Sequence, residues 1–338
     1  MHSVKVYIYN PYEGYFAIGR TINNFHTAFV RNGIECEVVS SLDGVPKDAI
    51  VIPYATEPAV EAVKKGYKPD YVYLADAYTL GYINKLKFYL KRLDIFNYDF
   101  LYTIHAFLQD FRIERKVARS YKNIIFVSET DADYFKIKYG DGFNTMCIKA
   151  GIDNCVVAPK TASDSLRLGI LATWDHPSIT YENGWFIKDY FAKFTKEHPD
   201  IKLYLAGRGK YISNYKSVKN VEIIGEVVDL DDFFKNIDVF IAVNPKGCGI
   251  LNRVLDAFTH KTCVLGFKPS FSGFRYMENS FLEFDSYRSF VEQMEYILQN
   301  PQIKEKMVQN ASLNIQKYNN WEANNDEFVR NYFVGPSK

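Results

Sequence analysis

The chain has 338 residues, a formal net charge of +1 at pH 7, and a composition that is 47% hydrophobic and 24% charged. This length predicts two domains of about 150 residues each, because a single hydrophobic core rarely grows much larger. The apolar content excludes an intrinsically disordered chain. The balanced charge argues against a surface that coats nucleic acid, so any charged partner must be met locally.

The cysteines and the longest apolar runs indicate the cellular compartment. The five cysteines are scattered, without a C-x-x-C pair or a cysteine-histidine cluster at zinc spacing. Residues 1–40 lack the basic start, apolar core and cleavage site of a signal peptide. Apolar runs such as 239–243 are much shorter than the roughly 20 residues that span a bilayer. We therefore expect a cytoplasmic protein, at most peripheral at the inner face of the cell membrane.

Short β-branched or aromatic runs alternate with amphipathic stretches, which is the pattern of a parallel sheet covered by helices on both faces. Strands are predicted first at 4–9, 35–40, 49–53, 70–74, 123–128 and 145–149, with one helix over 100–121. Small residues and Pro159 place a linker at 153–165. Later strands are predicted at 168–173, 202–207, 221–225, 238–243, 262–267 and 281–284. The tail 287–332 reads as helical, with breaks near Pro301 and at 319–320.

This rhythm predicts an α/β fold with two Rossmann-like, doubly wound domains that face each other across a cleft. The first domain covers 1–152 and the second covers 153–320, and a helix in 321–338 is expected to return to the first domain. Ligands of such sheets sit outside the carboxyl ends of the strands. Candidate site residues are therefore sought where strands end.

One segment combines a strand end, glycines and a helix start: Asn244-Pro-Lys-Gly-Cys-Gly-Ile-Leu-Asn-Arg-Val-Leu-Asp-Ala-Phe258. Gly247 and Gly249 allow a ligand to approach the backbone closely, and the amides of 249–252 would form an anion site aided by the helix dipole. Arg253 is placed to contact phosphate and Asp256 to accept hydrogen bonds from ribose hydroxyls. Spacing alone leaves open an ordinary turn followed by a solvated arginine and an unremarkable aspartate.

The same segment resembles the nucleotide-binding loop and helix of retaining GT-B glycosyltransferases of family four (glycosyl transferases group 1), written G-x-G-x-x-[NK]-[KR]-x-x-E-A. Further stretches resemble that family in the same order: 124–131, 147–153, 168–186, 203–209 and 221–229. The resemblance implies that the first domain binds the acceptor and the second the nucleotide-sugar donor. It implies a donor site formed by Gly247, Cys248, Gly249, Ile250, Leu251, Asn252, Arg253 and Asp256, with Arg208 as a further phosphate contact.

Two departures from the family pattern affect this site. Cys248 stands where members usually carry an acid that contacts the donor sugar, and Asp256 is shorter by one methylene than the usual ribose-binding glutamate. Residues 174–184 also lack the arginine and lysine that usually hold the diphosphate. Arg253 is therefore our first candidate for that role and Arg208 our second. The other candidates are Lys210, Lys246 and, more weakly, His176.

The first domain supplies the other candidates. Asp76, after the strand at 70–74, is the candidate catalytic residue because it could orient a hydroxyl, with helix capping as the alternative. Tyr15, Gly19 and Tyr78 are expected to line the acceptor cleft. In the family the departing diphosphate is thought to take the acceptor proton, so no dedicated protein base is required.

Two further motifs have plain structural explanations. His105 lies inside the predicted helix 100–121 and is discounted as a catalyst. Asp229-Leu-Asp-Asp232 contains the D-x-D metal motif of GT-A enzymes, but it reads better as a helix cap with an acidic first turn. No metal and no cofactor are expected beyond the nucleotide diphosphosugar itself.

The resemblance implies a hexosyltransferase-type enzyme that moves a sugar, with retention and without metal, to a hydroxyl of a glycan or lipid-linked glycan. A growing bacterial surface polysaccharide is the expected acceptor. The basic, apolar stretch 82–93 could rest on an anionic membrane, or it could be a core-facing helix with a solvated basic edge. A nucleotide-sugar epimerase, a DNA glucosyltransferase and a non-catalytic sugar-nucleotide-binding protein stay open as alternatives, although a nucleic-acid partner is not expected.

Overall fold

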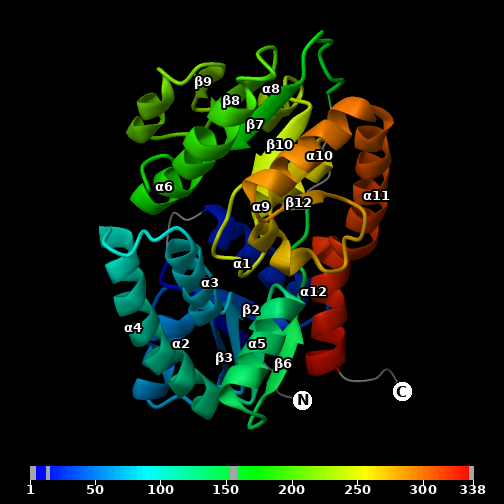
Figure 1. Cartoon of the computed structure of the whole chain (residues 1–338). Helices are drawn as coiled ribbons and strands as arrows, with labels where there is room; N and C mark the ends of the chain where they lie inside the picture. Colours follow the sequence, from blue (N-terminus) through cyan, green and yellow to red (C-terminus); the bar gives the residue numbers. More distant parts are fainter. Residues whose placement is uncertain (1–4, 13–15, 153–157, 335–338) are drawn as a thin grey trace. The chain divides into compact units, whose positions relative to one another are not determined.

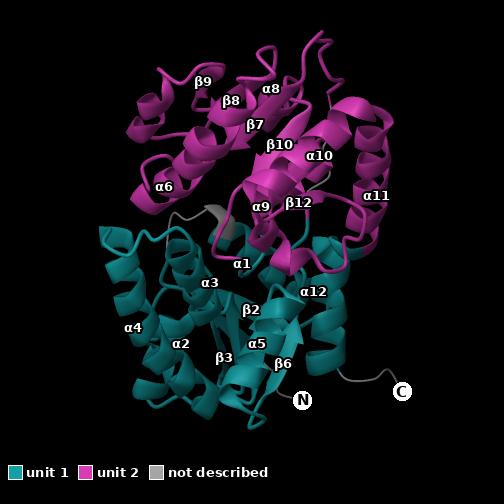
Figure 2. Cartoon of the chain, viewed as in Figure 1, with its two compact units in different colours: residues 1–151, 248–250, 318–338 teal, residues 152–247, 251–317 magenta. Residues whose placement is uncertain are grey.

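The computed structural model describes residues 5–12, 16–152 and 158–334, with the side chains of residues 16 and 17 left out. The chain forms two compact units, coloured separately in Figure 2. Unit 1 consists of residues 1–151, 248–250 and 318–338, and unit 2 of residues 152–247 and 251–317. This division differs from the predicted bounds at residue 152, which lies in unit 2, and at residues 248–250 and 318–320, which lie in unit 1.

Unit 1 contains two three-stranded parallel sheets, ordered β2-β1-β3 and β4-β5-β6. A parallel bridge between Tyr54 and Tyr73 connects them. The strands are β1 (Lys5–Tyr9), β2 (Glu35–Val39), β3 (Ile50–Pro53), β4 (Tyr71–Ala75), β5 (Asn123–Phe126) and β6 (Asn144–Cys147). The helices are α1 (Phe16–Arg31), α2 (Thr56–Lys64), α3 (Tyr78–Lys91), α4 (Tyr98–Ser120), α5 (Glu129–Tyr139), α12 (Trp321–Val329) and η4 (Arg330–Val334), as labelled in Figure 1 where there is room.

Helices cover both faces of these sheets, as the strand alternation requires. Ile125 of β5 faces a core formed with Phe25 of α1 and Phe328 of α12. Its neighbour Phe126 faces the opposite core, which includes Val117 of α4 and residues of α2 and α5. The C-terminal helix α12 is therefore part of the wall of unit 1.

Unit 2 is built on one parallel sheet of the order β12-β11-β10-β7-β8-β9. Its strands are β7 (Arg167–Leu171), β8 (Lys202–Ala206), β9 (Val221–Gly225), β10 (Val239–Ala242), β11 (Cys263–Phe267) and β12 (Leu282–Phe284). Its helices are α6 (Pro177–Trp185), η1 (Phe186–Phe191), α7 (Ala192–Phe194), η2 (Lys210–Tyr215), α8 (Leu230–Phe234), α9 (Asn252–Thr259), η3 (Lys268–Phe274), α10 (Tyr287–Gln299) and α11 (Gln302–Tyr318). All residues of β10 and β11 are buried, because helices lie on both faces.

Every predicted strand is present, within two residues at each end. The tail also breaks where predicted, between α10 and α11 near Pro301 and between α11 and α12. At the second break the Asn320 side chain caps α12 by accepting a hydrogen bond from the Ala323 N–H at 3.0 Å. Among the described residues, no helix combines the length and the apolar character needed to cross a bilayer.

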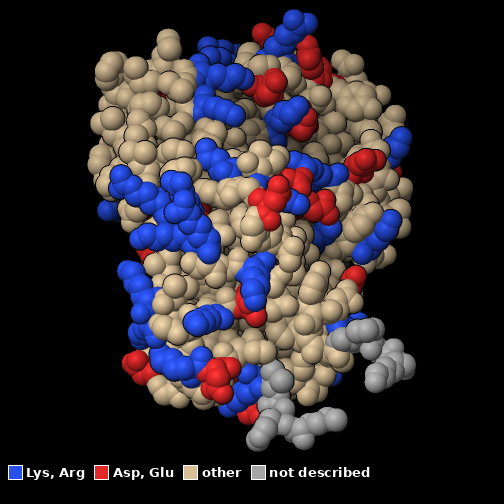
Figure 3. Space-filling view, turned by 90° about the horizontal axis from the view of Figure 1, so that it is seen from below, with Lys and Arg blue, Asp and Glu red and all other residues tan. Residues whose placement is uncertain are grey.

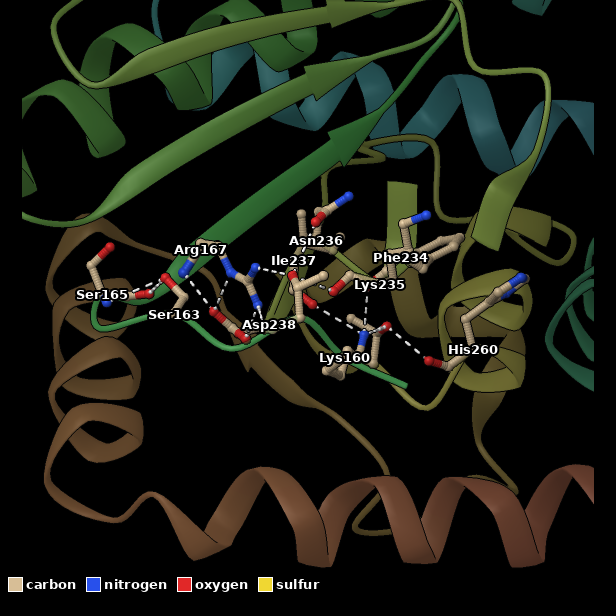
Figure 4. A network of polar contacts seen from close by, with 12 residues as sticks. Lys160, Ser163, Ser165, Arg167, Phe234, Lys235, Asn236, Ile237, Asp238 and His260 are labelled. Atoms are coloured by element: carbon tan, nitrogen blue, oxygen red, sulfur yellow. Dashed lines mark hydrogen bonds and ion pairs between the residues drawn. The ribbon is translucent and has the colours of Figure 1, made fainter. Parts of the chain in front are cut away.

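A polar network within unit 2 includes Lys160, Thr161, Ser163 and Ser165 of the predicted linker (Figure 4). Arg167 pairs with Asp238 at 3.0 Å and donates to the Thr161 hydroxyl at 2.6 Å. The Lys160 ammonium donates to the carbonyls of Phe234, at 2.7 Å, and Ile237, at 3.0 Å. Residues 153–157 lie outside the described part of the chain. Because Arg167 begins β7 and Asp238 precedes β10, the network marks the amino edge of the sheet.

Candidate functional site

The strand order of unit 2 reverses between β7 and β10, and such a switch point is where an open α/β sheet binds its ligands. The chain leaves β7 through residues 172–176 and leaves β10 through residues 243–251. The predicted donor segment therefore follows one of the two strands that define this point.

The loops that follow β7 and β8 pack directly against one another. A Cβ atom on Gly207 would lie 1.9 Å from the Ala172 carbonyl oxygen, and one on Gly209 would lie 2.3 Å from the Asp175 nitrogen. The buried Trp174 indole donates to the Ala206 carbonyl at 2.8 Å. These glycines are thus required by loop packing, which is reason enough for the family-like Ala-Gly-Arg-Gly sequence.

The start of α9 offers backbone donors. Within the described part of the chain, the N–H groups of Ile250, Leu251 and Asn252 donate to no other protein group. Leu251 is the N-cap and contributes no side-chain cap. Gly249 is different, because its N–H donates to the Asp131 carboxylate at 2.8 Å. The predicted anion site therefore has donors at residues 250–252 and not at Gly249.

Arg253 lies in the first turn of α9, among carboxylates of unit 2. Burial lowers the pKa of its guanidinium, while the charges of Asp256 and Glu182 act in the opposite direction. An arginine so placed stays protonated, because its intrinsic pKa is so high. Arg253 is half-buried, which differs from a fully solvated surface charge, and its phosphate role stays a prediction.

Glu182 was missed by sequence reasoning. It lies on α6, is 5% exposed, and accepts a hydrogen bond from the Ser178 hydroxyl at 3.1 Å. A buried carboxylate usually needs a nearby cation, and Arg253 is the cation whose pKa its charge affects. A local signal was the spacing of four residues between Glu182 and Ser178, which places both side chains on one face of α6.

The remaining basic candidates are less enclosed. Arg208 is exposed in the loop after β8, and its carbonyl accepts from the Trp174 N–H at 2.8 Å. Lys210 is exposed and Lys246 is half-buried. His176 is the N-cap residue of α6 but makes no side-chain cap. Arg253 is the candidate with the most defined electrostatic environment.

Asp131 organises the carboxyl edge of unit 1. It is fully buried on α5, and its carboxylate accepts from the N–H groups of Ala77 and Gly249, each at 2.8 Å. The Ser128 hydroxyl also donates to it. Burial raises the pKa of Asp131, and these hydrogen bonds lower it. One carboxylate therefore ties residues 248–250 to the turn between β4 and α3.

Asp76 lies against the same loop. A Cβ atom on Gly249 would be 2.0 Å from Asp76 Oδ1, so the carboxyl group occupies the space that a side chain there would need. The N-cap of α3 is Ala77, without a side-chain cap, so the capping alternative for Asp76 is wrong. Ala75, just before it, has φ +66°, a conformation that costs energy and recurs at functional sites.

Tyr78, predicted in the acceptor cleft, begins α3 and is half-buried. Burial raises the pKa of its phenol, and the neighbouring Asp76, Tyr54, Tyr12 and Cys248 raise it further. The structure therefore gathers Asp76, Tyr78 and Cys248 near one another in unit 1. Tyr12, which sequence reasoning did not single out, belongs to the same group.

The two other predicted cleft residues are not tested in the same way. Gly19 lies on α1, and a Cβ atom there would meet nothing within 4 Å. Tyr15 lies outside the described residues. Both assignments stay predictions.

Comparison with known proteins gives similarity in structure only. No family model and no curated protein sequence matches the chain. A sucrose-phosphate synthase from Thermosynechococcus elongatus is similar over 97% of this chain and 98% of its own, with TM-score 0.70 and 11% identity. HepE from Anabaena, solved with UDP, is similar over 97% of this chain and 98% of its own, with TM-score 0.64 and 11% identity. TarM from S. aureus is similar over 84% of this chain and 54% of its own, with TM-score 0.63 and 13% identity.

The chain has a GT-B fold. At these identities the likeness establishes the fold and leaves the activity to be argued from the site.

Residues 229–232 and His105 have the structural positions that the sequence predicted for them. Asp229 is the N-cap of α8 and accepts from the Asp231 N–H at 2.9 Å. Asp232 pairs with Lys235. His105 is an exposed residue of α4. Among the described residues, no group of three or more histidine, cysteine or acidic side chains is arranged to hold a metal ion.

Proposed function

We propose that this protein is a glycosyltransferase that moves a sugar from a nucleotide diphosphosugar to a hydroxyl group of an acceptor. The observation that carries the proposal is the start of α9, where three backbone N–H groups without a partner among the described residues precede the half-buried, charged Arg253. A diphosphate is the ligand chemistry that such a helix start favours. The position after β10, at the switch point, is the ligand edge of a GT-B fold's sheet.

Asp256 is the proposed ribose contact, and uridine is the proposed nucleoside of the donor. Asp256 lies one turn after Asn252 on α9 and is half-buried, which suits a carboxylate that accepts from ribose hydroxyls. HepE, similar in structure, was solved with UDP and with UDP-glucose. UDP-glucose is therefore the first donor to test.

The proposed transfer retains the anomeric configuration and uses no metal. A trehalose-6-phosphate synthase of similar structure has been studied for glycosyl transfer with retention, which supports the proposal by analogy. Arg253 and the α9 amides would stabilise the charge that develops on the leaving diphosphate, a role that metal ions fill elsewhere. Asp76, lying against the loop that contains Cys248, is the proposed substitute for the missing sugar-contacting acid.

A thermal-shift screen against UDP-, GDP-, ADP-, TDP- and CMP-sugars tests the donor site. A ligand at 100 times its dissociation constant stabilises a native protein by about 2.7 kcal/mol, which a melting curve resolves. Stabilisation by one nucleotide family is expected, and no response to any of the five would refute the proposed donor site. Transfer should persist in EDTA, so its loss would refute metal independence.

A non-catalytic sugar-nucleotide-binding protein is the second candidate, and the presence of Cys248 in place of an acid favours it. Binding of the donor without hydrolysis or transfer, across a broad panel of hydroxyl acceptors, would support this alternative. Asp76→Asn separates the two: it should abolish turnover with little change in nucleotide affinity if Asp76 contacts the sugar.

The acceptor is proposed to be a growing, membrane-linked glycan of a bacterial surface polysaccharide. The structure changes the reason for expecting membrane contact. In the basic stretch 82–93, Lys85 is buried and Arg92 pairs with Asp94 at 2.9 Å. The turn between α3 and α4 is instead strongly apolar, with Leu93 82% exposed and Phe96 93% exposed. Apolar and aromatic side chains with nearby lysines are typical of surfaces that insert into the membrane interface.

Vesicle co-sedimentation tests this contact on the full chain. Leu93→Ser with Phe96→Ser should abolish binding to vesicles that contain 30% phosphatidylglycerol. Leu313→Ser is a suitable control, because Leu313 is 66% exposed on α11 in unit 2. Equal binding by the turn variant and the wild type would refute membrane contact through this turn.

A further inference from the structure

Unit 1 contains a half-open pocket that the proposed transfer does not use. Its volume is about 590 Å³, within the range of small-molecule sites. It is formed between the last turns of α4 and the end of α5 with the loop to β6. The residues used below are Phe111, Arg115, Arg119, Lys138, Tyr139 and Phe143.

The charge of this pocket is entirely positive. Arg115 and Arg119 are four residues apart on α4 and therefore share one helix face. Lys138 approaches from α5, and its ammonium lies 5.2 Å from the centre of the Phe111 ring. Within the described part of the chain, none of these three cations forms an ion pair with a carboxylate.

One acid lies in the loop beside the pocket: Asp141 is exposed, and its carboxylate is 3.8 Å from the Lys136 ammonium. The nearest acid on this part of α4, Glu114, is fully buried and already accepts hydrogen bonds from Thr79, at 3.2 Å, and from Tyr139, at 2.9 Å. Figure 3, seen from below the view of Figure 1, shows Lys and Arg side chains in several clusters with Asp and Glu side chains beside some of them. Three unpaired cations around one pocket repel one another, so an anion is the ligand that relieves this cost.

The position of the pocket separates it from the proposed transfer site. Arg119 lies just before the amino end of β5, and Phe143 directly precedes β6. Asp76 and residues 248–250 lie instead at the carboxyl end of β4. A strand of four residues is roughly 13 Å long, so the two edges of the sheet are distinct ligand environments.

We propose that this pocket binds a phosphate-bearing ligand, with Arg115, Arg119 and Lys138 contacting the phosphate. Two arginines on one helix face offer paired N–H donors that match phosphate oxygens. Phe111, Tyr139 and Phe143 provide an apolar wall for the group that carries the phosphate. The phosphate belongs either to a soluble phosphorylated molecule or to a lipid headgroup, and the proposal does not depend on the donor assignment.

Titration calorimetry on the full chain tests the pocket, with saturating UDP present so that the proposed donor site is filled. The probes are inorganic phosphate and glycerol 3-phosphate. The double variant Arg115→Ala with Arg119→Ala should weaken binding by about tenfold or more, because it removes two charge-assisted contacts. The matched control is Arg112→Ala with Lys116→Ala, which removes the same charge from exposed positions of the same helix outside the pocket.

The outcomes distinguish a soluble phosphate ligand from a lipid headgroup, and failure of the pocket proposal from failure of the proposed function. Binding of the soluble probes identifies a soluble ligand, whereas binding only to phosphatidylglycerol vesicles, with the same response to the variants, identifies a lipid headgroup. Equal weakening by the pocket and control variants would show nonspecific attraction and overturn the proposal, as would the absence of binding to every probe. Failure of UDP to bind would count against the proposed function alone.

Discussion

Replacing Gly249 by alanine tests the close approach of Asp76 to Gly249 within unit 1. Gly249 has φ +64°, and an added Cβ would meet three atoms of the Asp76 carboxyl group, at 2.0, 2.6 and 2.9 Å. The left-handed conformation costs alanine about 1–2 kcal/mol. Because the whole Asp76 carboxyl group must move, its polar interactions are lost as well, which costs about 2 kcal/mol more.

Gly33→Ala is the matched control. Gly33 has φ +77°, but a Cβ there would meet nothing within 4 Å, so only the conformational cost applies. Gly249→Ala should therefore lower the melting temperature by roughly 4–8 °C more than Gly33→Ala does. Differential scanning fluorimetry measures this difference. Hydrogen exchange followed by mass spectrometry assigns it to peptides of unit 1.

A double-mutant cycle with Asp76→Ala isolates the clash. In the Asp76→Ala background, Gly249→Ala should cost no more than Gly33→Ala, which gives a coupling of about 2 kcal/mol. If Gly249→Ala and Gly33→Ala are equally destabilising in the wild-type background, the close approach of Asp76 to Gly249 does not exist in solution.

Three other predictions follow from buried charges. Arg253→Met should reduce UDP-sugar affinity at least tenfold by calorimetry, because it removes the guanidinium proposed to contact the diphosphate. Adding Glu182→Gln should not restore affinity, and recovered affinity would contradict the phosphate role. Burial raises the pKa of Glu114 from 4.5 to about 7, so the native state binds more protons than the unfolded state between these pH values. The free energy of unfolding should therefore fall by up to about 3 kcal/mol as pH rises from 4.5 to 7. Glu114→Gln should flatten this slope in urea titrations, and an unchanged slope would contradict the prediction. Burial lowers the pKa of Lys160 from 10.5 to about 8, so stability should rise with pH between these values, and Lys160→Met should lose that rise.

The strands were predictable because each is a short apolar run between turn signals. Buried strands such as β10 and β11 are apolar at every position, which a sequence displays directly. The two helix breaks in the C-terminal tail were also predictable, because Pro301 and Asn320 end or begin a helix through local backbone chemistry. Predictions of this kind need no knowledge of distant contacts.

The candidate site was less predictable because its groups meet across long sequence separations. Asp131 and Gly249 are 118 residues apart, and nothing local to either residue indicates their hydrogen bond. Glu182 and Arg253 influence one another from different helices, α6 and α9. The spacing of Arg115 and Arg119 on one helix is the local sign of the basic pocket. Lys138 reaches that pocket only through tertiary packing.

Gly249 shows why a glycine motif is an ambiguous sign of ligand binding. The sequence interpretation held that glycine at this position lets a ligand approach the backbone. In the structure its N–H is already used by Asp131, and the space beside its Cα is filled by Asp76. The φ of +64° and the close approach of Asp76 therefore select glycine at this position even without a ligand. The donors left for a diphosphate begin one residue later, at Ile250, and the motif therefore positions the anion site rather than forming it.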